Sequence, residues 1–244
     1  MAEPVFGLHA VDALLRQRPA DVQTLWVQSG RTDKRIKAIL ELASNQGVSV
    51  QQMSRAALDE KVSGRHQGVI ALVSGSAAGW DEARLLEHLQ ALEHPPLLLV
   101  LDGVTDPHNL GACLRSADAA GVDAVIVPRD KSADLNPTVR KVACGAAESV
   151  PFVRVTNLAR CLAALKDAGV WLFGAAGEAD TLLYDIDLTG PAALVMGAEG
   201  SGLRRLTREA CDALMRLPMA GDVSSLNVSV AAGICLFEAV RQRR

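Results

Sequence analysis

The sequence contains few aromatic residues and no apolar run long enough to cross a lipid bilayer. Phe, Trp and Tyr make up 3% of the 244 residues, whereas hydrophobic residues as a whole make up 49%. A core of this composition is built mainly from Ala, Val, Leu and Ile. The N-terminus also lacks the basic start and long apolar stretch of a signal peptide. We therefore expect a cytoplasmic protein of one large domain or two unequal ones, without a membrane partner.

The sequence also lacks the cysteine and histidine patterns that are typical of metal sites. Its five cysteines are widely scattered, and no two have the close spacing of a zinc-binding or redox motif. The five histidines show no such spacing either. We expect buried free thiols and no metal. The chain likewise shows no Ser-His-Asp set and no pair of catalytic carboxylates.

The chain has no large excess of charge of either sign, because 25 Lys and Arg nearly balance 28 Asp and Glu and the formal net charge is −3. The distribution is more informative than the total. Residues 1–74 carry nine Lys/Arg and seven Asp/Glu, net +2, residues 75–96 have net −3, and residues 97–244 have net −2. A mild positive bias at the N-terminal end is compatible with RNA binding without establishing it.

Apolar periodicity divides the chain into three parts. Residues 1–74 read as a small α/β unit, which we interpret as a substrate-binding domain. The unit combines helices at 7–17, 34–46 and 54–62 with strands at 22–28, 48–53 and 69–73. Residues 75–96 form a linker, in which GSAAG (75–79) indicates a hinge before an acidic helix. The third part, residues 97–244, has a different pattern.

From Leu97 onward, short buried strands alternate with helices. This alternation predicts an α/β fold with a mostly parallel sheet, in which ligands bind at the carboxyl ends of the strands. The expected strands are 97–102, 124–127, 150–155, 170–174, 192–196 and 213–217, with helices at 110–120, 137–147 and 158–168.

The loop after the first of these strands reads DGVTDPHNLGACLRSADAAG. Asn109 is suited to cap a helix that begins at Leu110. Gly111 and Arg115 are four residues apart, which places a guanidinium beside a residue without a side chain. A phosphate or ribose could approach there. A surface pair between Arg115 and Asp118 is the simpler interpretation of this stretch taken alone.

A glycine-rich turn, MGAEGSGL, follows the strand at 192–196. Its spacing differs from G-x-G-x-x-G, and Glu199 lies within the turn. A carboxylate there would repel a phosphate, so the turn suits a ligand without phosphate, such as S-adenosylmethionine. The alternative is a plain glycine turn with an exposed acid, although the density of glycines favours close backbone approach to a ligand.

The stretch LPMAGDVSSLNVSVAAG (217–233) places a small polar loop before an almost uncharged final helix. Ser224 or Ser225 would be suited to cap that helix and do nothing more. With the two earlier loops, however, the stretch supplies amides, hydroxyls, an acid and a guanidinium at one sheet edge. This inventory suits positioning and electrostatic stabilisation of a transfer to a hydroxyl.

Three motifs, NLGACLR, MGAEGSGL and LPMAGDVSSLNVSVA, resemble those of the SPOUT-class (TrmH-type) RNA ribose 2′-O-methyltransferases. The resemblance covers essentially the whole chain and extends to FGLHAV and RHQGV in the first 74 residues. It is nearest to members that methylate one guanosine in the peptidyl-transferase P-loop of 23S rRNA. It implies a ribosomal-protein-like RNA-binding domain, a SPOUT domain with a C-terminal trefoil knot, and a homodimer.

The resemblance also implies the cofactor, S-adenosyl-L-methionine, and the site. The implied cofactor-binding residues are Gly197, Leu217 and Leu226. The implied catalytic and RNA-contacting residues are Arg115, Asn109, Glu199, Ser225 and Asn227. The implied mechanism is in-line displacement, in which the ribose 2′-oxygen attacks the methyl carbon.

The implied role of Arg115 depends on its charge. A guanidinium stays protonated in proteins, so we interpret Arg115 as a cation for the adjacent phosphate and the developing alkoxide. Asn109 would then orient Arg115 or its loop, and Glu199 would hold one of these two by a hydrogen bond. Ser225 and Asn227 would fix the knot loop and the cofactor edge.

Three alternatives to an rRNA methyltransferase stay open. The same chemistry on a tRNA ribose is the nearest, although basic tails flanking the catalytic part would favour it and only residues 241–244 form a short one. A non-catalytic ribosome-assembly factor that binds RNA would not need Arg115, Glu199 and Asn227 together. A nucleotide-dependent oxidoreductase is disfavoured by the missing G-x-G-x-x-G.

Overall fold

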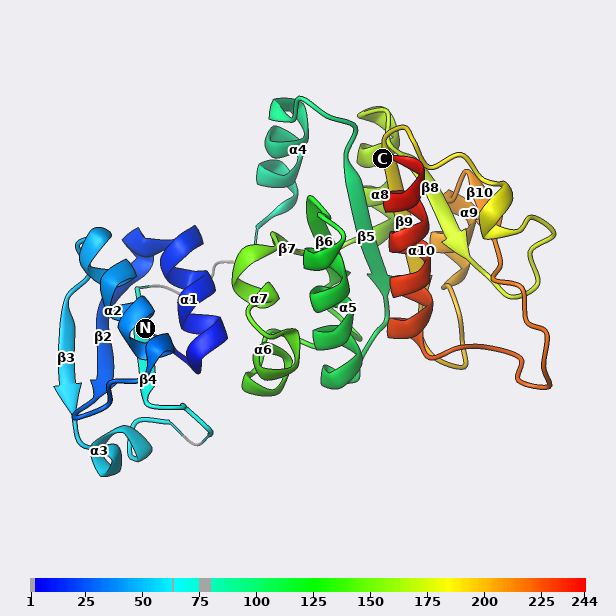
Figure 1. Cartoon of the computed structure of the whole chain (residues 1–244). Coiled ribbons are helices and arrows are strands. Elements are labelled where there is room, and N and C mark those ends of the chain that lie inside the picture. The colour runs from blue at the N-terminus through cyan, green and yellow to red at the C-terminus, as the bar shows by residue number, and fades with distance from the viewer. Residues whose placement is uncertain (1–2, 63, 75–79) are drawn as a thin grey trace. The chain divides into compact units, whose positions relative to one another are not determined.

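The computed structural model describes residues 3–62, 64–74 and 80–244. The chain divides into two compact units (Figure 1). One comprises Met1–Ala78 with Cys144–Ser149, and the other comprises Gly79–Ala143 with Val150–Arg244. The hinge expected at GSAAG (75–79) lies outside the described residues, and the domain limits at residues 74 and 96 stay a prediction.

The N-terminal unit is a four-stranded sheet with the strand order β1-β4-β2-β3. β4 is antiparallel to both β1 and β2, and β3 is parallel to β2. The strands are β1 (Glu3–Phe6), β2 (Val22–Gln28), β3 (Val50–Met53) and β4 (Val69–Val73). The helices are α1 (Leu8–Gln17), α2 (Lys34–Asn45) and α3 (Arg55–Asp59), with a 3₁₀ turn at Pro19–Asp21. The three strands and three helices expected here are present, whereas β1 was not predicted.

Local capping explains where two of these helices begin. The Asp33 side chain accepts a hydrogen bond from the Ile36 N–H at 3.3 Å and caps α2. The Ser54 hydroxyl accepts one from the Ala57 N–H at 3.2 Å and caps α3. Both residues satisfy an N–H that the first helical turn leaves without a backbone partner. The amphipathic faces of α1 and α2 then pack on the sheet and form the core of this unit.

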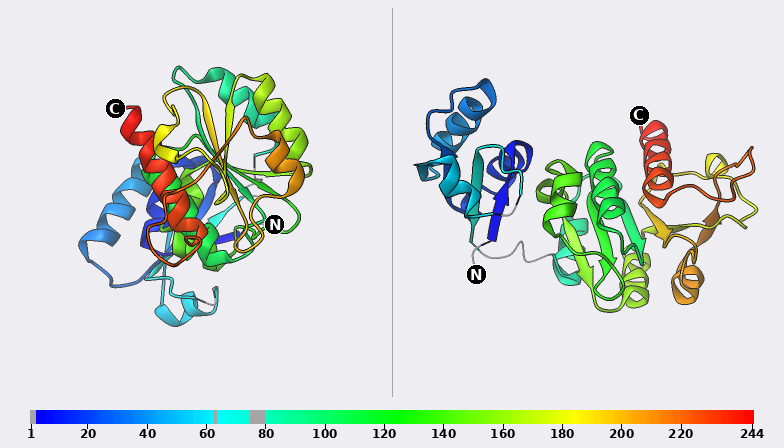
Figure 2. Two further views of the ribbon diagram at one scale, coloured as in Figure 1. Left: turned by 90° about the vertical axis from the view of Figure 1, so that its right-hand side faces the viewer. Right: turned by 90° about the horizontal axis from the view of Figure 1, so that it is seen from below.

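The second unit is a six-stranded, wholly parallel sheet with the order β10-β8-β9-β5-β6-β7. Its strands are β5 (Leu97–Asp102), β6 (Ala124–Pro128), β7 (Phe152–Val155), β8 (Trp171–Ala175), β9 (Ala192–Gly197) and β10 (Ala213–Met215). Figure 2 shows α5, α6 and α10 over one face of this sheet and α4, α8 and α9 over the other. The predicted α/β class with a parallel sheet is therefore confirmed.

The helices of the chain beyond residue 80 largely match the expected positions. They are α4 (Glu82–Ala91), α5 (Pro107–Ala119), α6 (Pro137–Ala143), α7 (Ala146–Ser149), α8 (Leu158–Asp167), α9 (Arg205–Ala210) and α10 (Val228–Gln242), with a 3₁₀ turn at Leu183–Asp185. The single helix expected over 137–147 is wrong. Cys144 and Gly145 have φ angles of 54° and 103°, and a helix cannot continue through this left-handed backbone. Across the described residues, none of the helices has the length and apolar character needed to span a membrane.

The start of α5 differs from the prediction. The helix begins at Pro107, and Asp106 caps it by accepting a hydrogen bond from the His108 N–H at 3.0 Å. A proline at the first helical position, preceded by an aspartate, indicates the start of a helix more strongly than an asparagine two residues further on. Asn109 is therefore not the cap, and its side chain is available to the site. Leu110, Leu114 and Ala117 form an apolar stripe on α5 and are fully buried.

Gly111 has a packing role that was not anticipated. A Cβ added there would lie 2.7 Å from Val142 Cβ and 2.9 Å from the Val139 carbonyl oxygen. Gly111 therefore lets α5 approach the α6 segment closely. The space beside it is filled by the protein itself, so the expectation that a phosphate or ribose approaches at this glycine is wrong.

The final helix, α10, is capped by Asn227, whose Oδ1 accepts a hydrogen bond from the Ser229 N–H at 2.9 Å. The cap expected at Ser224 or Ser225 is therefore wrong. Helix α10 packs against α5 and β9. At its end, Gln242 Nε2 donates to the Ile186 carbonyl at 3.0 Å, which ties the helix to the segment between β8 and β9.

Candidate active site

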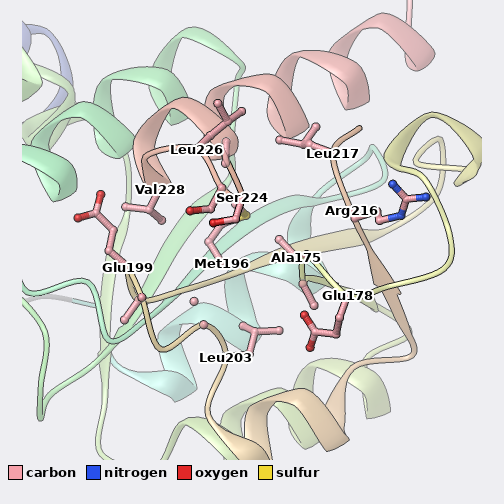
Figure 3. Close-up of a pocket in the computed structure, with 18 of the residues that line it drawn as sticks. Ala175, Glu178, Met196, Glu199, Leu203, Arg216, Leu217, Ser224, Leu226 and Val228 are labelled. Atoms are coloured by element: carbon pink, nitrogen blue, oxygen red, sulfur yellow. The ribbon is translucent and has the colours of Figure 1, made fainter. Parts of the chain in front are cut away.

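A cavity of about 760 Å³ lies where β8, β9 and β10 end (Figure 3). The loops that leave these strands line it, together with the segment that leads into α10. Its place agrees with the rule that parallel sheets bind ligands beyond the carboxyl ends of their strands. Its volume is within the range of sites for small ligands and cofactors.

The glycine-rich turn after β9 folds back on itself. Ala198 N donates to the Gly202 carbonyl at 3.1 Å, and Gly202 N donates to the Ala198 carbonyl at 2.9 Å. A Cβ on Gly197 would lie 2.2 Å from the Gly202 carbonyl carbon and 2.4 Å from Leu203 N. Gly197 is therefore required by the backbone of this turn. The close packing of the turn therefore explains the glycine at position 197. The same turn also forms one wall of the cavity.

The residue after this turn is held by a buried carboxylate. Asp102, the last residue of β5, is fully buried, and its Oδ2 accepts a hydrogen bond from Arg204 N at 3.0 Å. The Arg204 guanidinium pairs with the other oxygen of the same carboxylate. The turn is thereby fixed at Gly197 by close packing and at Arg204 by an ion pair.

A carboxylate held by two amides joins the three sequence motifs. Glu199 Oε1 accepts hydrogen bonds from Asn227 Nδ2 at 2.6 Å and from Asn109 Nδ2 at 3.1 Å. Asn227 Nδ2 also lies 2.9 Å from Asn109 Oδ1. The expected hydrogen bond between Glu199 and Asn109 is present. Asn109, which is 90 positions from Glu199 and 118 from Asn227, thus joins them in one polar cluster, which we call the amide–carboxylate cluster.

Most of the residues singled out in the sequence lie at the cavity. Those that line it are Gly197, Leu217, Leu226, Glu199, Ser225 and Asn227. Asn109 is buried and reaches the cavity through its bonds to Glu199 and Asn227. Arg115 is exposed on α5 and is not among the lining residues, so the structure does not bring it to the cavity wall.

Sequence reasoning missed the opposite end of the cavity. Glu178, from the loop after β8, pairs with Arg208 of α9, and Arg216 follows β10. Figure 3 shows Glu178 and Arg216 on the side of the cavity away from Glu199. The available signal was the polar segment GEAD directly after the buried strand β8. It was not recognised because the sequence does not reveal that β8 lies between β9 and β10.

The walls between the two charged ends are largely apolar, and Met196, Leu203 and Met215 contribute to them. Glu199 disfavours a phosphate at its end of the cavity, whereas Glu178 at the other end is paired with Arg208. The arrangement suits a ligand with an apolar ring and separate polar groups. Among the described residues, no group of three or more His, Cys, Asp or Glu side chains is placed to hold a metal ion.

The cysteines near the site are packing residues. Burial raises the pKa of Cys113 in α5 and of Cys235 in α10 to about 12. It raises the pKa of Cys211, at the end of α9, to about 11. A thiol with so high a pKa is almost entirely protonated near neutral pH and is a poor nucleophile. The thiols are free, as expected, but the expected burial holds only for Cys113, Cys161 and Cys235, because Cys211 is half-buried and Cys144 is exposed.

Two family models match the chain. The one described as the SpoU rRNA Methylase family covers residues 96–237. The one described as RNA 2′-O ribose methyltransferase substrate binding covers residues 4–77. Together they span both units of the structure.

Several known proteins are similar in sequence to this chain over nearly its whole length. The protein named 23S rRNA (guanosine-2′-O-)-methyltransferase RlmB from Pseudomonas aeruginosa is 64% identical over 241 residues, 99% of this chain and 97% of the relative. The protein of the same name from Escherichia coli K12 is 59% identical over 244 residues and 100% of both chains. The SpoU methyltransferase AviRb from Streptomyces viridochromogenes, solved with AdoMet, has a TM-score of 0.80 and 29% identity, and covers 99% of this chain and 90% of its own.

Proposed function

The chain belongs to the SpoU rRNA Methylase family, and from that premise we propose that it transfers a methyl group from S-adenosyl-L-methionine to the ribose 2′-hydroxyl of a guanosine in 23S rRNA. The observation that carries the proposal is the 59% to 64% identity, over 99% or more of the chain, to relatives named for this reaction. Within 23S rRNA, the resemblance points to a guanosine of the peptidyl-transferase P-loop. Such a substrate is consistent with a cytoplasmic protein.

The cavity fits the proposed cofactor. S-adenosylmethionine supplies an electrophilic methyl group on a sulfonium and carries no phosphate. The apolar walls at Met196 and Leu203 suit its adenine ring, and the polar ends suit its ribose hydroxyls, amine and carboxylate. Gly197, Leu217 and Leu226 would hold it, and the fixed turn after β9 gives this wall a preformed shape. A preformed wall lowers the entropic cost of binding.

The amide–carboxylate cluster would position the reacting groups. Asn109 and Asn227 hold Glu199 at one orientation, and Asn227 is itself fixed as the cap of α10. Both amides are neutral, so the charge of Glu199 is oriented without being cancelled. A negative group beside the cavity would favour a cationic sulfonium. Ser225 lines the same wall and would contribute its hydroxyl there.

Arg115 would act on the RNA side of the site, because it is exposed on α5 and outside the cavity wall. Its permanent charge suits the phosphate next to the reacting ribose and the alkoxide that develops on the 2′-oxygen. Arg115→Lys keeps the charge and loses the planar fork. We expect methyl transfer to fall by about tenfold or more while calorimetric cofactor affinity stays unchanged. Full activity in this variant would remove Arg115 from the mechanism.

The deciding experiment uses labelled S-adenosylmethionine with a 23S rRNA domain V transcript and with bulk tRNA, followed by mapping of the methylated nucleotide. Label on a ribose of the P-loop guanosine is the expected result. Label only on tRNA would keep the chemistry and overturn the substrate. Cofactor binding without label on either RNA would indicate that an assembly intermediate is the substrate. Neither binding nor label would favour the non-catalytic RNA-binding factor.

The homodimer is also part of the proposal. Val230 and Phe237 are seven residues apart on α10, so they share a face, and they are 50% and 49% exposed. Pairing of this face of α10 with a second copy of the chain would remove both side chains from water. Size measurement in solution checks this, because a single species of monomer mass at micromolar concentration would contradict it.

We further propose the trefoil knot that the resemblance implies. The segment that follows β10, beyond β8 at the sheet edge, returns to α10, which packs on β9 and α5. Such a return would let the last residues pass through an earlier loop. Pulling both termini in a single-molecule experiment tests it. A knotted chain reaches a shorter final extension than its residue number allows, and a full extension would contradict the knot.

A further inference from the structure

Three strand ends of the N-terminal unit, and the two segments that leave or enter them, lie at one edge of its sheet. β2 and β3 are parallel, and their last residues, Gln28 and Met53, are paired. β4 runs antiparallel to β2, so its first residue, Val69, lies at the same end, paired with Val27. The segments 29–37 and 54–68, which leave or enter these strand ends, therefore share one edge of the unit. We call this the basic edge.

The charge of the N-terminal unit is concentrated at the basic edge. Segments 29–37 and 54–68 contain seven Lys/Arg and three Asp/Glu, net +4. The rest of residues 1–74 contains two Lys/Arg and four Asp/Glu, net −2. The weak overall bias of +2 thus hides a strong separation of charge within one small unit. A concentration of cations of this kind attracts a polyanion.

Two of the three acids of the edge are already engaged by the protein, and the third, Glu60, is exposed. Asp33 caps α2 and pairs with Arg31, and Asp59 lies 2.8 Å from His66 Nε2. By contrast, Lys34, Arg35 and Arg65 are exposed, and none forms an ion pair or side-chain hydrogen bond with the described residues. These three cations are therefore available to an outside partner.

The residues that follow Arg65 in its loop are held by contacts within the N-terminal unit. His66 is buried, and its Nδ1 accepts a hydrogen bond from Gly68 N at 3.0 Å. Gln67 has a φ of 53°, its side-chain oxygen accepts from Leu8 N at 3.1 Å, and its carbonyl accepts from Arg31. A non-glycine residue in this conformation persists only where the surroundings enforce it. Arg65 is thus presented from a fixed loop, which lowers the ordering cost of a contact.

We propose that the basic edge is the surface through which the N-terminal unit holds the RNA substrate, with Lys34, Arg35 and Arg65 contacting its phosphates. The inference rests on the proposed function, because that function supplies RNA as the partner. A phosphate backbone matches a row of unpaired cations, and such contacts orient a nucleic acid without reading its sequence. The N-terminal unit would then supply affinity for RNA, and the second unit would select the nucleotide.

The test compares two triple variants of the full chain. Lys34→Ala/Arg35→Ala/Arg65→Ala removes the three edge cations. Arg16→Ala/Arg160→Ala/Arg205→Ala removes three exposed arginines elsewhere, each paired only at the surface, and changes the net charge equally. Equilibrium binding to the domain V transcript is measured at several salt concentrations. Calorimetry of S-adenosylmethionine binding checks that the cavity is intact.

The edge variant is expected to bind the transcript about tenfold or more weaker than the wild type near 0.1 M salt. The magnitude of its slope of log K against log salt should also fall by about 2, because each of the three lost phosphate contacts contributes about 0.7 to 0.9. The control variant should stay within about threefold of the wild type, and cofactor affinity should be unchanged in both. An edge variant that binds like the wild type, or equal losses in the two variants, would overturn the inference. Weakened binding by the edge variant supports it even if the wild type methylates no RNA, an outcome that would overturn only the proposed function.

Discussion

Asp102 and Glu199 are carboxylates at the ends of two adjacent strands, and their surroundings differ. Asp102 is fully buried and pairs with the guanidinium of Arg204. Glu199 is exposed and accepts hydrogen bonds from the amides of Asn109 and Asn227. An arginine cancels the first charge, whereas neutral amides only orient the second. The contrast separates a carboxylate that holds the fold from one whose charge remains available to a ligand.

The largest effect is expected from Arg204→Ala. This change leaves the Asp102 carboxylate buried without its cation, which costs about 3–5 kcal/mol of unfolding free energy. Urea unfolding followed by circular dichroism measures it. Arg205→Ala is the matched control, because Arg205 is 75% exposed in its side chain and pairs with Glu209 at the surface. A loss of the same size in both variants would contradict a structural role for Asp102.

The second prediction concerns the charge of Glu199. Both amides donate to Oε1, so Glu199→Gln keeps an oxygen for them and removes the charge, whereas Glu199→Ala removes both. We expect methyl transfer to fall about 100-fold in each variant, with unfolding free energy within about 1 kcal/mol of the wild type for Glu199→Gln. Single-turnover transfer to the domain V transcript gives the rate. Normal rates with Gln and low rates with Ala would show that only orientation matters.

The third prediction concerns the glycine-rich turn after β9, which carries Glu199 and leads to Arg204, the partner of Asp102. Gly197→Ala places a Cβ against the Gly202 backbone, so we expect a loss of about 1–3 kcal/mol in unfolding free energy and weaker cofactor binding. Gly221→Ala is the control, since nothing lies within 4 Å of a Cβ there and its φ is compatible with alanine. Denaturant unfolding and calorimetry measure the two effects. Unchanged values for Gly197→Ala would mean that the turn is not held as tightly as its geometry indicates.

The smallest effect is expected at a third carboxylate, Glu238 of α10. Hydrogen bonds from Arg241 and Gln242 lower its pKa from 4.5 to about 2. Because the folded state favours the ionised form, this stabilisation is present above about pH 4.5 and is lost as the pH falls toward 2. We expect the unfolding free energies of the wild type and Glu238→Gln to differ by less than about 1 kcal/mol above this interval, and the difference to vanish as the pH falls through it. Denaturant unfolding at several pH values measures the difference. A difference that does not depend on pH would contradict this origin.

The sequence predicts the convergence of the three motifs and every named strand except β1, because apolar periodicity and turn residues are local signals. Local signals also gave wrong predictions, and two of them concern the site. The sequence pattern predicts a cap at Asn109, whereas Asp106 and Pro107 begin the helix and leave the Asn109 amide for Glu199. The glycine density after β9 favours close backbone approach to a ligand, whereas Gly197 is needed by the turn itself. In the first case the deciding bond is to Glu199, 90 positions away, and in the second it is a close contact that arises only when the turn folds back on itself.

The sequence by itself determined the fold class, the polar loops that follow buried strands, and the family resemblance that joins them. These features depend on residue order and on the periods of strands and helices. Only the tertiary structure decided that β8 lies between β9 and β10, which brings Glu178 and Arg216 to the cavity. It also decided that Asp102 is neutralised and Glu199 is not. Strand order and the partners of a charge depend on contacts between distant segments, which a single sequence does not specify.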